Sequence, residues 1–337
     1  MTIYEEELCY WSHENQLWHR LEGKTVMISG ATGLIGKCLI DLFMQHGNVK
    51  VIAMSRNETV AKERFSTYWN RDYFRYISSD VNKAIPECGY VDYIIHAASN
   101  THPQLYSKDA VGTITSNVLG TKNLLDYGIF HKTQRFCFVS SVEIYGENRG
   151  DVEKFDESYL GYLDCNTLRA GYPEGKRVGE ALCNAYKEAY GLDFVIPRLS
   201  RVYGPTMLKS DSKAASQFIK KAALGENIVL KSKGEQKYSY IFVTDAVAGI
   251  LHSIIYGKSG EAYNVTDEES DITLKELAEK LAVIAGTQVV YELPEEGEKK
   301  GYSIATKAML DVTKLRNLGW KARVHMKKGL LCTIGSL

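Results

Sequence analysis

The chain has 337 residues, enough for one large domain or two unequal ones with an ample hydrophobic core. Its 41 basic and 41 acidic residues balance, so the charge predicts neither a nucleic-acid partner nor a membrane surface. No run approaches the roughly eighteen apolar residues that a membrane-spanning helix needs.

The N-terminus and the cysteines predict a cytoplasmic protein. The first seven residues are acidic and lack a signal-peptide pattern. Seven cysteines, scattered from Cys9 to Cys332, show neither a paired framework nor a metal-ligand spacing. We therefore expect buried thiols, no structural disulfide and no metal site.

Residues 1–22 form a predicted helical extension before the first strand. Trp11, Leu17, Trp18 and Leu21 recur at near-helical spacing. Such a helix packs either on the body of the protein or on a second subunit, and we favour the body.

A strand, a glycine-rich turn and a helix come next. Residues 24–29 are a short apolar strand, and residues 38–44 are apolar at helical spacing. This order is typical of the unit that opens a dinucleotide-binding fold, where glycines let the backbone approach a pyrophosphate at the helix N-terminus. The alternative is an ordinary glycine-bearing turn. The candidate cofactor residues of the turn are Gly30, Thr32, Gly33, Leu34, Ile35 and Gly36.

Strands and helices then alternate as far as residue 200. The expected strands are 49–54, 74–77, 90–98, 135–141 and 194–198, with helices around 117–125 and from about 173 to 190. This pattern predicts an α/β, Rossmann-like, doubly wound parallel sheet with right-handed crossovers.

Past Tyr203-Gly204-Pro205 the elements become shorter and more polar, with helices expected at 212–224 and 273–285. We therefore predict a dinucleotide-binding domain over 23–200 and a smaller C-terminal α/β substrate lobe over 201–337, partly interleaved with it. The cleft between the two is the expected ligand site.

Tyr172 and Lys176 are the leading catalytic candidates. Residues four apart on a helix share one face, and an ammonium beside a phenol favours the phenolate, so we expect a lowered pKa for Tyr172. Pro173 is tolerated in a first helical turn and disfavours helical backbone before it. We therefore place Tyr172 at the helix start, where the helix dipole also favours the phenolate.

Ser140, Ser141 and Glu143 follow a predicted strand, about thirty residues before Tyr172. Ligands bind beyond the carboxyl ends of the strands in such a sheet. A hydroxyl there can hydrogen-bond a substrate oxygen while Tyr172 exchanges its proton, which suits hydride transfer at a carbinol carbon. The alternative for the serine pair is a turn.

Together these motifs resemble the extended short-chain dehydrogenase/reductase family, in its nucleotide-sugar epimerase, dehydratase and decarboxylase branch. The resemblance covers roughly residues 23 to 330. Its segments are Gly30 to Gly36, Asp80-Val81, His96 to Ser99, Asn117 to Thr121, Ser140 to Gly146, Tyr172 to Lys176, Val202 to Pro205, Val243 to Asp245, Tyr263 to Val265, Asp311 to Lys314 and Leu318 to Trp320.

The resemblance implies that Tyr172 is the acid/base, that Lys176 lowers its pKa and holds the nicotinamide ribose, and that Ser141 is the catalytic hydroxyl. It also implies homodimers. For each of these residues the alternative is a purely structural role, and for Asn117 the two interpretations are evenly balanced. The further cofactor contacts that it implies are Asp80, Val81, Ala97, Ala98, Ser99 and Asn117.

The end of the second strand bears on the cofactor. An acidic residue there would bind the adenosine ribose and repel a 2′-phosphate. This chain instead has Ser55-Arg56-Asn57, with no carboxylate before Glu58. A guanidinium and a hydroxyl suit a phosphate, so NADP(H) is favoured, with NAD(H) as the alternative. Arg56 could instead stack on the adenine.

The chain also departs from the family pattern. Val142-Glu143 replaces the Asp-Glu pair of the dehydratases, which argues against 4,6-dehydration. Tyr238 stands where an arginine usually reaches the nucleotide diphosphate, and Arg201 replaces an asparagine. The candidate substrate-binding residues are therefore Arg201, Lys237, Tyr238 and Lys307. The alternative for the three basic residues is a solvated surface charge.

We thus expect an NAD(P)-dependent enzyme that acts on a nucleotide-diphosphate sugar, foremost an epimerase with Tyr172 as acid/base. The alternatives are a decarboxylase resembling those that act on UDP-glucuronate, or a ketoreductase. A non-catalytic dinucleotide-binding regulator is disfavoured because Ser141, Tyr172 and Lys176 are retained together.

Overall fold

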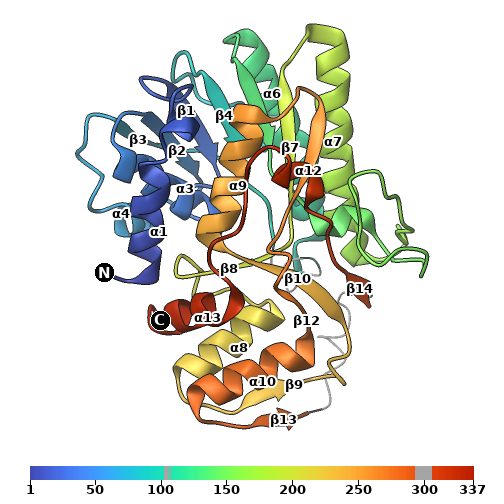
Figure 1. The fold of residues 1–337 in the computed structure, drawn as a ribbon. Helices are drawn as coiled ribbons and strands as arrows, with labels where there is room; N and C mark the ends of the chain where they lie inside the picture. The colour runs from blue at the N-terminus through green and yellow to red at the C-terminus, as the bar shows by residue number, and fades with distance from the viewer. Residues whose placement is uncertain (102–105, 107, 293–305) are drawn as a thin grey trace.

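The computed structural model of the protein describes residues 1–101, 106, 108–292 and 306–337. Most of the chain forms an upper body around one large sheet, and a smaller body lies below it (Figure 1). No helix in the described residues is long and apolar enough to cross a membrane.

The large sheet has eight strands, and every pairing in it is parallel. Its strands lie in the order β11 (Glu261–Val265), β7 (Phe194–Leu199), β5 (Arg135–Phe138), β4 (Tyr93–His96), β1 (Thr25–Ser29), β2 (Lys50–Ser55) and β3 (Phe74–Ser78), with β6 (Ser140–Ser141) paired to β7. The strand order reverses beside β1, as in a Rossmann-like sheet. The predicted fold class is confirmed.

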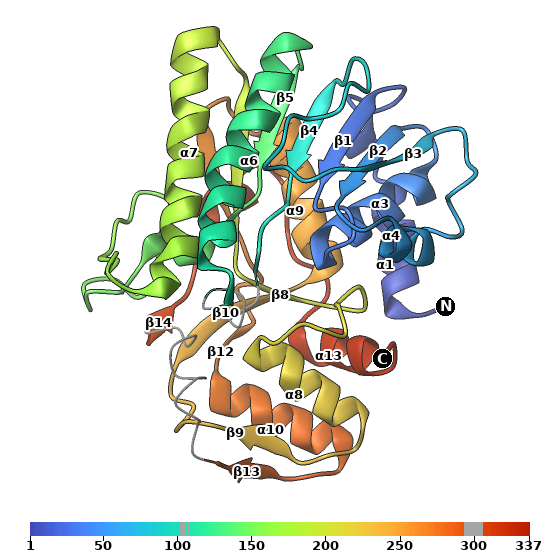
Figure 2. The same ribbon diagram turned by 180° about the vertical axis from the view of Figure 1, so that it is seen from behind.

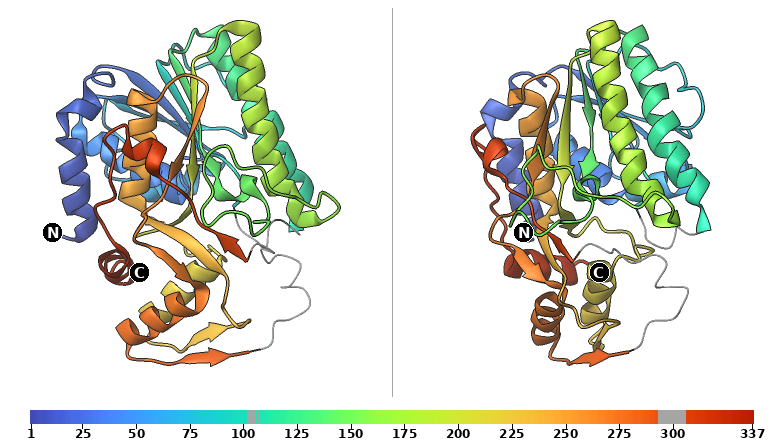
Figure 3. Two further views of the ribbon diagram at one scale, coloured as in Figure 1. Left: turned by 45° about the vertical axis from the view of Figure 1, so that its right-hand side comes forward. Right: turned by 90° about the vertical axis from the view of Figure 1, so that its right-hand side faces the viewer.

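Helices cover both faces of this sheet. α6 (Ala110–Phe130) and α7 (Gly171–Tyr190) lie side by side on one face, and α3 (Leu34–His46) and α9 (Val243–Tyr256) lie on the other (Figures 2 and 3). Successive side chains of a strand alternate between the faces. Val26 and Ile28 accordingly join the core beneath α3 and α9, and Met27 joins the core beneath α6 and α7. A strand buried on both faces is apolar throughout.

The N-terminal extension packs on the body, as expected, but as two helices rather than one. α1 (Ile3–Ser12) ends at the C-cap His13, and α2 (Asn15–Trp18) follows. Trp18 is buried and its indole N–H donates to the carbonyl of Trp11 at 2.8 Å. The Tyr4 hydroxyl donates to the Asp41 carboxylate on α3 at 2.7 Å.

The smaller body is built on a second sheet with its own core. In this sheet β10 (Lys237–Phe242) pairs with β8 (Arg201–Tyr203), β12 (Asp271–Thr273) and β14 (Lys307–Ala308). Two helices were predicted here and are found, as α8 (Ala214–Ala223) and α10 (Leu274–Ala285). The remaining elements are β9 (Ile228–Leu230), β13 (Val289–Tyr291) and α13 (Met326–Ile334).

The chain returns to the large sheet after residue 201, because α9 and β11 belong to the upper body. β10 of the lower sheet runs directly into α9 at Phe242–Val243, where both side chains are fully buried. The predicted strand 90–98 is shorter, since β4 ends at His96. The predicted strand 135–141 is divided into β5 and β6 at Val139.

Candidate active site

The glycine-rich turn between β1 and α3 is as tight as the sequence predicts. Gly30 has φ +72°, and a Cβ there would lie 2.7 Å from the carbonyl oxygen of Ala97. A Cβ on Gly36 would lie 2.4 Å from the Gly30 carbonyl oxygen. Both positions therefore require glycine.

The N-terminus of α3 suits a dinucleotide pyrophosphate. Its N-cap is Gly33, and no side chain of the described residues caps the helix. Backbone N–H groups of the first turn are thus left for an anion, which the helix dipole also favours. Among the described residues, a Cβ on Gly33 would have only the Gly30 carbonyl oxygen nearby, at 3.2 Å, so backbone and phosphate can approach closely. These residues fit a dinucleotide cofactor.

Asn117 makes hydrogen bonds that hold parts of the described chain together. It is fully buried on α6, its Oδ1 accepts from the Ser99 hydroxyl at 3.0 Å, and its amide donates to the carbonyl of Thr113 at 2.8 Å. It thereby ties the segment after β4 to α6. Val81, 8 % exposed, packs against Gly120 of the same helix.

No carboxylate stands at the end of β2, where the adenosine ribose of the cofactor is expected to bind. Ser55 shares a hydrogen bond of 3.2 Å with the Tyr76 hydroxyl, and the Arg56 side chain is exposed. Asn57 caps α4 (Glu58–Arg64) through the backbone N–H of Val60. Glu58, the first acid, is paired with Lys62 on that helix at 2.7 Å.

Ser141 and Tyr172 meet at the carboxyl end of the sheet. Ser141 ends β6 and caps a short 3₁₀ turn (Val142–Tyr145), accepting from the Glu143 backbone N–H at 3.3 Å. Its hydroxyl lies beside the Tyr172 phenol and lowers the pKa of that phenol. Tyr172 is the second residue of α7 and Pro173 the third, so the helix begins two residues before the predicted Pro173, and Tyr172 lies in its first turn.

Glu180 holds α7 against these strands. Its carboxylate accepts from the Ser140 hydroxyl at 2.6 Å and from two nitrogens of Arg198 on β7, at 3.1 and 2.7 Å. A bidentate arginine–carboxylate pair fixes direction as well as distance. The neighbouring Ser141 is therefore anchored relative to the helix that carries Tyr172.

The electrostatics of Tyr172 differ from the prediction. Burial raises its pKa to about 12, the nearby Ser141 hydroxyl and the Arg169 charge lower it, and the Glu143 charge raises it. Lys176 was expected to lower the pKa of Tyr172, but it is not among the groups that do so. The Lys176 ammonium instead donates to the carbonyl of Val139 at 2.8 Å, and burial lowers its own pKa to about 7.

A carboxylate lies between two guanidinium groups next to Tyr172. Glu143 pairs with Arg169 at 2.6 Å through one oxygen and with Arg201 at 3.6 Å through the other. The guanidinium carbon of Arg201 lies 3.4 Å from the ring centroid of Tyr238. Glu143, Arg201 and Tyr238 were predicted separately, and the structure brings them together.

Sequence reasoning missed Arg169 and Tyr106. The Tyr106 ring stacks on Tyr172, and Arg169 lies over Tyr106 with its guanidinium carbon 5.3 Å from the ring centroid. A 3₁₀ turn (Leu168–Ala170) leads directly into α7, which places Arg169 one turn before Tyr172. The i, i+3 spacing of Arg169 and Tyr172 was the available sequence signal. Pro173, however, predicted a later helix start.

Lys237 and Lys307 are register partners on neighbouring strands. Side chains alternate along a strand, so Lys237 lies on the face opposite to Tyr238. Hydrogen bonds from Thr273 are the main cause that lowers the pKa of Glu276 at the start of α10, and the Lys237 charge adds to the lowering. The predicted contact of these two lysines with a diphosphate stays a prediction.

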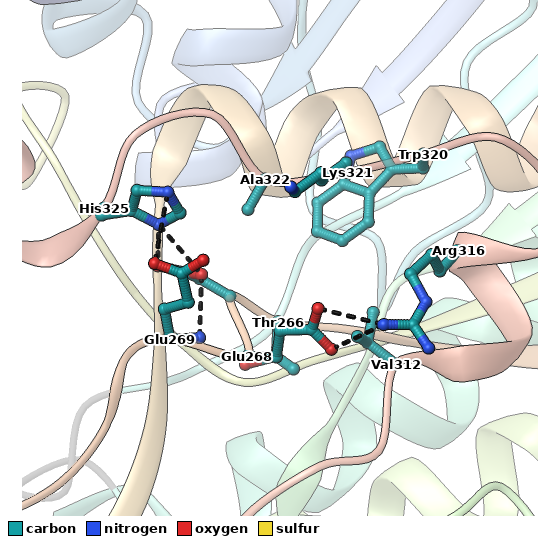
Figure 4. A pocket seen from close by; sticks show the side chains of 10 residues that line it. Thr266, Glu268, Glu269, Val312, Arg316, Trp320, Lys321, Ala322 and His325 are labelled. Carbon is teal, nitrogen blue, oxygen red and sulfur yellow. Dashed lines mark hydrogen bonds and ion pairs between the residues drawn. The ribbon is translucent and has the colours of Figure 1, made fainter.

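A separate pocket between the β11–β12 connection and the C-terminal segment contains none of the predicted site residues (Figure 4). Its charged groups are largely paired with each other. His325 lies 3.2 Å from Asp267 and 3.5 Å from Glu269, and Arg316 lies 3.1 Å from Glu268. No group of three metal-ligating side chains was found in the described part of the chain.

Comparisons with known proteins agree with this geometry. Residues 26–266 match the sequence profile described as "NAD dependent epimerase/dehydratase family". The chain is similar to UDP-glucuronic acid decarboxylase 5 of Arabidopsis thaliana, with 30% identity over 90% of this chain and 86% of that protein.

Two solved structures show the same fold. One is the UDP-N-acetylglucosamine 4-epimerase of Methanobrevibacter ruminantium, with a TM-score of 0.81, 21% identity, and coverage of 94% of this chain and 98% of that one. The other is the UDP-glucuronic acid 4-epimerase of Bacillus cereus in complex with UDP-glucuronic acid and NAD. Its TM-score is 0.78 at 20% identity, covering 93% of this chain and 98% of that one.

Proposed function

The chain belongs to the NAD dependent epimerase/dehydratase family, and on this premise we propose that it epimerises a nucleotide-linked sugar at carbon 4. The observation that carries the proposal is the placement of Ser141 beside Tyr172 at the carboxyl end of the sheet that also carries the glycine loop. Carbon 4 is the position named for the epimerases that share the fold.

Tyr172 would exchange the proton. As hydride leaves the sugar carbon, Tyr172 accepts the proton of its hydroxyl, and it returns that proton once hydride is delivered to the opposite face. Ser141 donates a hydrogen bond to the substrate oxygen and lowers the pKa of Tyr172. A bound nicotinamide dinucleotide supplies the hydride acceptor and donor. The net reaction consumes no reductant.

Lys176 would hold the ribose of that cofactor. Lys176 is 2 % exposed, and among the described residues its ammonium donates one hydrogen bond, to the carbonyl of Val139, so two donors are left for ribose hydroxyls. We further propose that NADP(H) is preferred over NAD(H). The exposed Arg56 at the end of β2, without a carboxylate beside it, supports this choice.

The test is a panel of UDP-, dTDP-, CDP- and GDP-linked sugars, followed by NMR and mass spectrometry with catalytic amounts of cofactor. Formation of the carbon-4 epimer from either direction supports the proposal. Stoichiometric loss of NADPH would identify a ketoreductase instead. An unaltered panel together with bound cofactor would identify a regulator.

Decarboxylation is the second candidate. It is favoured by the 30% identity with a UDP-glucuronic acid decarboxylase and by the presence of both Ser141 and Glu143. Release of CO2 from UDP-glucuronic acid, with a pentose product of lower mass, would establish it over epimerisation.

A further inference from the structure

We infer that Arg169 and Arg201 bind a carboxylate on the sugar ring, so that the substrate is a nucleotide-linked uronic acid. The inference rests on the proposed function, because it assigns the substrate class of the same site. The two arginines lie on different segments, one just before α7 and the other on β8.

The local charge is net positive and therefore favours the binding of an anion. Two guanidinium groups share the single carboxylate of Glu143, at 2.6 and 3.6 Å, which leaves one positive charge in excess within this triad. Both side chains are largely buried, at 13 % and 22 % exposure. A buried charge without a partner is costly, so such a group favours an incoming anion.

Each guanidinium also has hydrogen-bonding capacity to spare. The Nη1 atoms of Arg169 and Arg201 are both buried, and neither has a hydrogen-bond partner within the part of the chain that the structure describes. Buried donors in native proteins are nearly always satisfied. A carboxylate offers two acceptor oxygens, so one bound anion can satisfy both donors.

Aromatic rings orient the two groups. Arg201 lies over Tyr238 at 3.4 Å, and Arg169 lies over Tyr106 at 5.3 Å, each measured from the guanidinium carbon to the ring centroid. Arginine stacks on such rings and keeps its donors directed along the guanidinium plane. The two guanidinium groups are therefore held in place by their neighbours, unlike mobile charges on the protein surface.

The position of the pair favours a sugar carboxylate over the diphosphate. Arg169 and Glu143 both act electrostatically on Tyr172, so the cluster lies next to the carbon whose hydroxyl Tyr172 would deprotonate. In a hexuronic acid, the carboxyl-bearing carbon 5 is bonded to carbon 4. The diphosphate is attached to carbon 1, across the ring.

The test compares UDP-glucuronic acid with UDP-glucose, which carries a neutral hydroxymethyl group instead. We expect Arg169→Met and Arg201→Met each to lower kcat/KM for UDP-glucuronic acid by about tenfold or more, and for UDP-glucose by less than about threefold. Arg149→Met is the matched control, because that arginine is exposed and paired with Asp151. It should leave both values unchanged.

A binding measurement separates this inference from the proposed function. We expect the Kd of UDP alone, measured by calorimetry, to be unchanged in both variants. Weaker UDP binding would show that the arginines bind the diphosphate and would overturn the inference. An equal loss for both sugars in Arg201→Met would also overturn it, whereas Arg169 additionally acts on the pKa of Tyr172. If the protein turns over neither these two sugars nor any other member of the panel, the epimerase proposal fails.

In that case the inference is still decided by the Kd values of the two sugars. A preference for UDP-glucuronic acid that disappears with the Arg169 and Arg201 variants supports it, and equal affinities overturn it. If a methionine variant does not fold, Arg169→Lys keeps the charge without the planar donor pair. It should recover part of the preference for the uronic acid.

Discussion

The ring of Tyr106 stacks on the ring of Tyr172, with centroids 5.2 Å apart and an angle of 25° between the planes. Tyr106 belongs to the segment between β4 and α6, and Tyr172 begins α7, so the contact joins distant parts of the chain. Both rings are buried, and burial raises the pKa of both phenols. Tyr172 therefore holds its proton strongly at neutral pH and depends on its neighbours to release it.

Tyr172→Phe should abolish turnover while leaving the fold intact. The variant removes the proton-transfer group but keeps the buried ring, so we expect a loss of about 10²- to 10⁴-fold in kcat and an unchanged Tm. Tyr190→Phe, on the same helix and 63 % exposed, is the control. Full activity of Tyr172→Phe would rule out the mechanism.

Ser141→Ala should shift the pH dependence of turnover toward alkaline pH. The Ser141 hydroxyl lowers the pKa of Tyr172, so its removal should raise that pKa further. Activity that needs the phenolate rises as pH approaches the pKa, and the plateau should be reached at a higher pH in the variant. Profiles of kcat/KM that extend to the most alkaline pH at which both proteins stay folded would show it. A profile that is lowered but not displaced would argue for a role in positioning alone.

Arg56→Ala should remove the preference for NADP(H). Losing a charged contact to a 2′-phosphate weakens NADP(H) binding by about tenfold or more and leaves NAD(H) binding nearly unchanged. Titrating both cofactors by fluorescence or calorimetry tests this. Arg75→Ala, exposed on the adjacent strand β3, controls for loss of surface charge. A wild-type protein that prefers NAD(H) would contradict the prediction directly.

Asp245 should make folding stability fall as pH rises from about 4 to about 7. Its carboxyl is fully buried at the start of α9 and accepts from the backbone N–H groups of Arg323 and Val324, at 3.0 and 2.8 Å. Burial raises its pKa to about 7. The folded state then binds a proton that the unfolded state has released, so the contribution is complete below about pH 4 and is lost through pH 7.

The slope of this effect is at most about 1.4 kcal/mol per pH unit. Urea unfolding at several pH values would measure it, with Asp245→Asn as the comparison. The asparagine keeps an acceptor oxygen for Arg323 and Val324 and does not titrate. Identical pH dependence in both proteins would show that other groups control acid stability.

The sheet was predictable because its signals are local. Strands buried on both faces are continuous apolar runs, and the residues of the glycine turn are consecutive in the chain. The positions and order of β1 and α3 therefore follow from the sequence. The surroundings of Tyr172 are not local. Its pKa depends on Glu143 and Arg169, and on burial to which Tyr106 contributes, and these come from three separate segments.

Lys176 illustrates the same limit. The i, i+4 spacing correctly places it on the helix face of Tyr172, but the direction of its ammonium is set by the carbonyl of Val139 in the neighbouring sheet. A single sequence contains no signal for that carbonyl. Arg201 was identified as a basic residue in an unusual place, yet its partner Glu143 became evident only once β8 was positioned.

The uninterrupted passage from β10 into α9 constrains how the protein admits its ligand. One of the peptides that join the two bodies lies at Phe242–Val243, whose side chains are packed in the two cores that a hinge at this point would have to separate. Hinges absorb backbone rotation at positions free of such packing. We expect the two bodies to tumble as one rigid unit, so that substrate reaches Tyr172 by rearrangement of side chains rather than by domain opening.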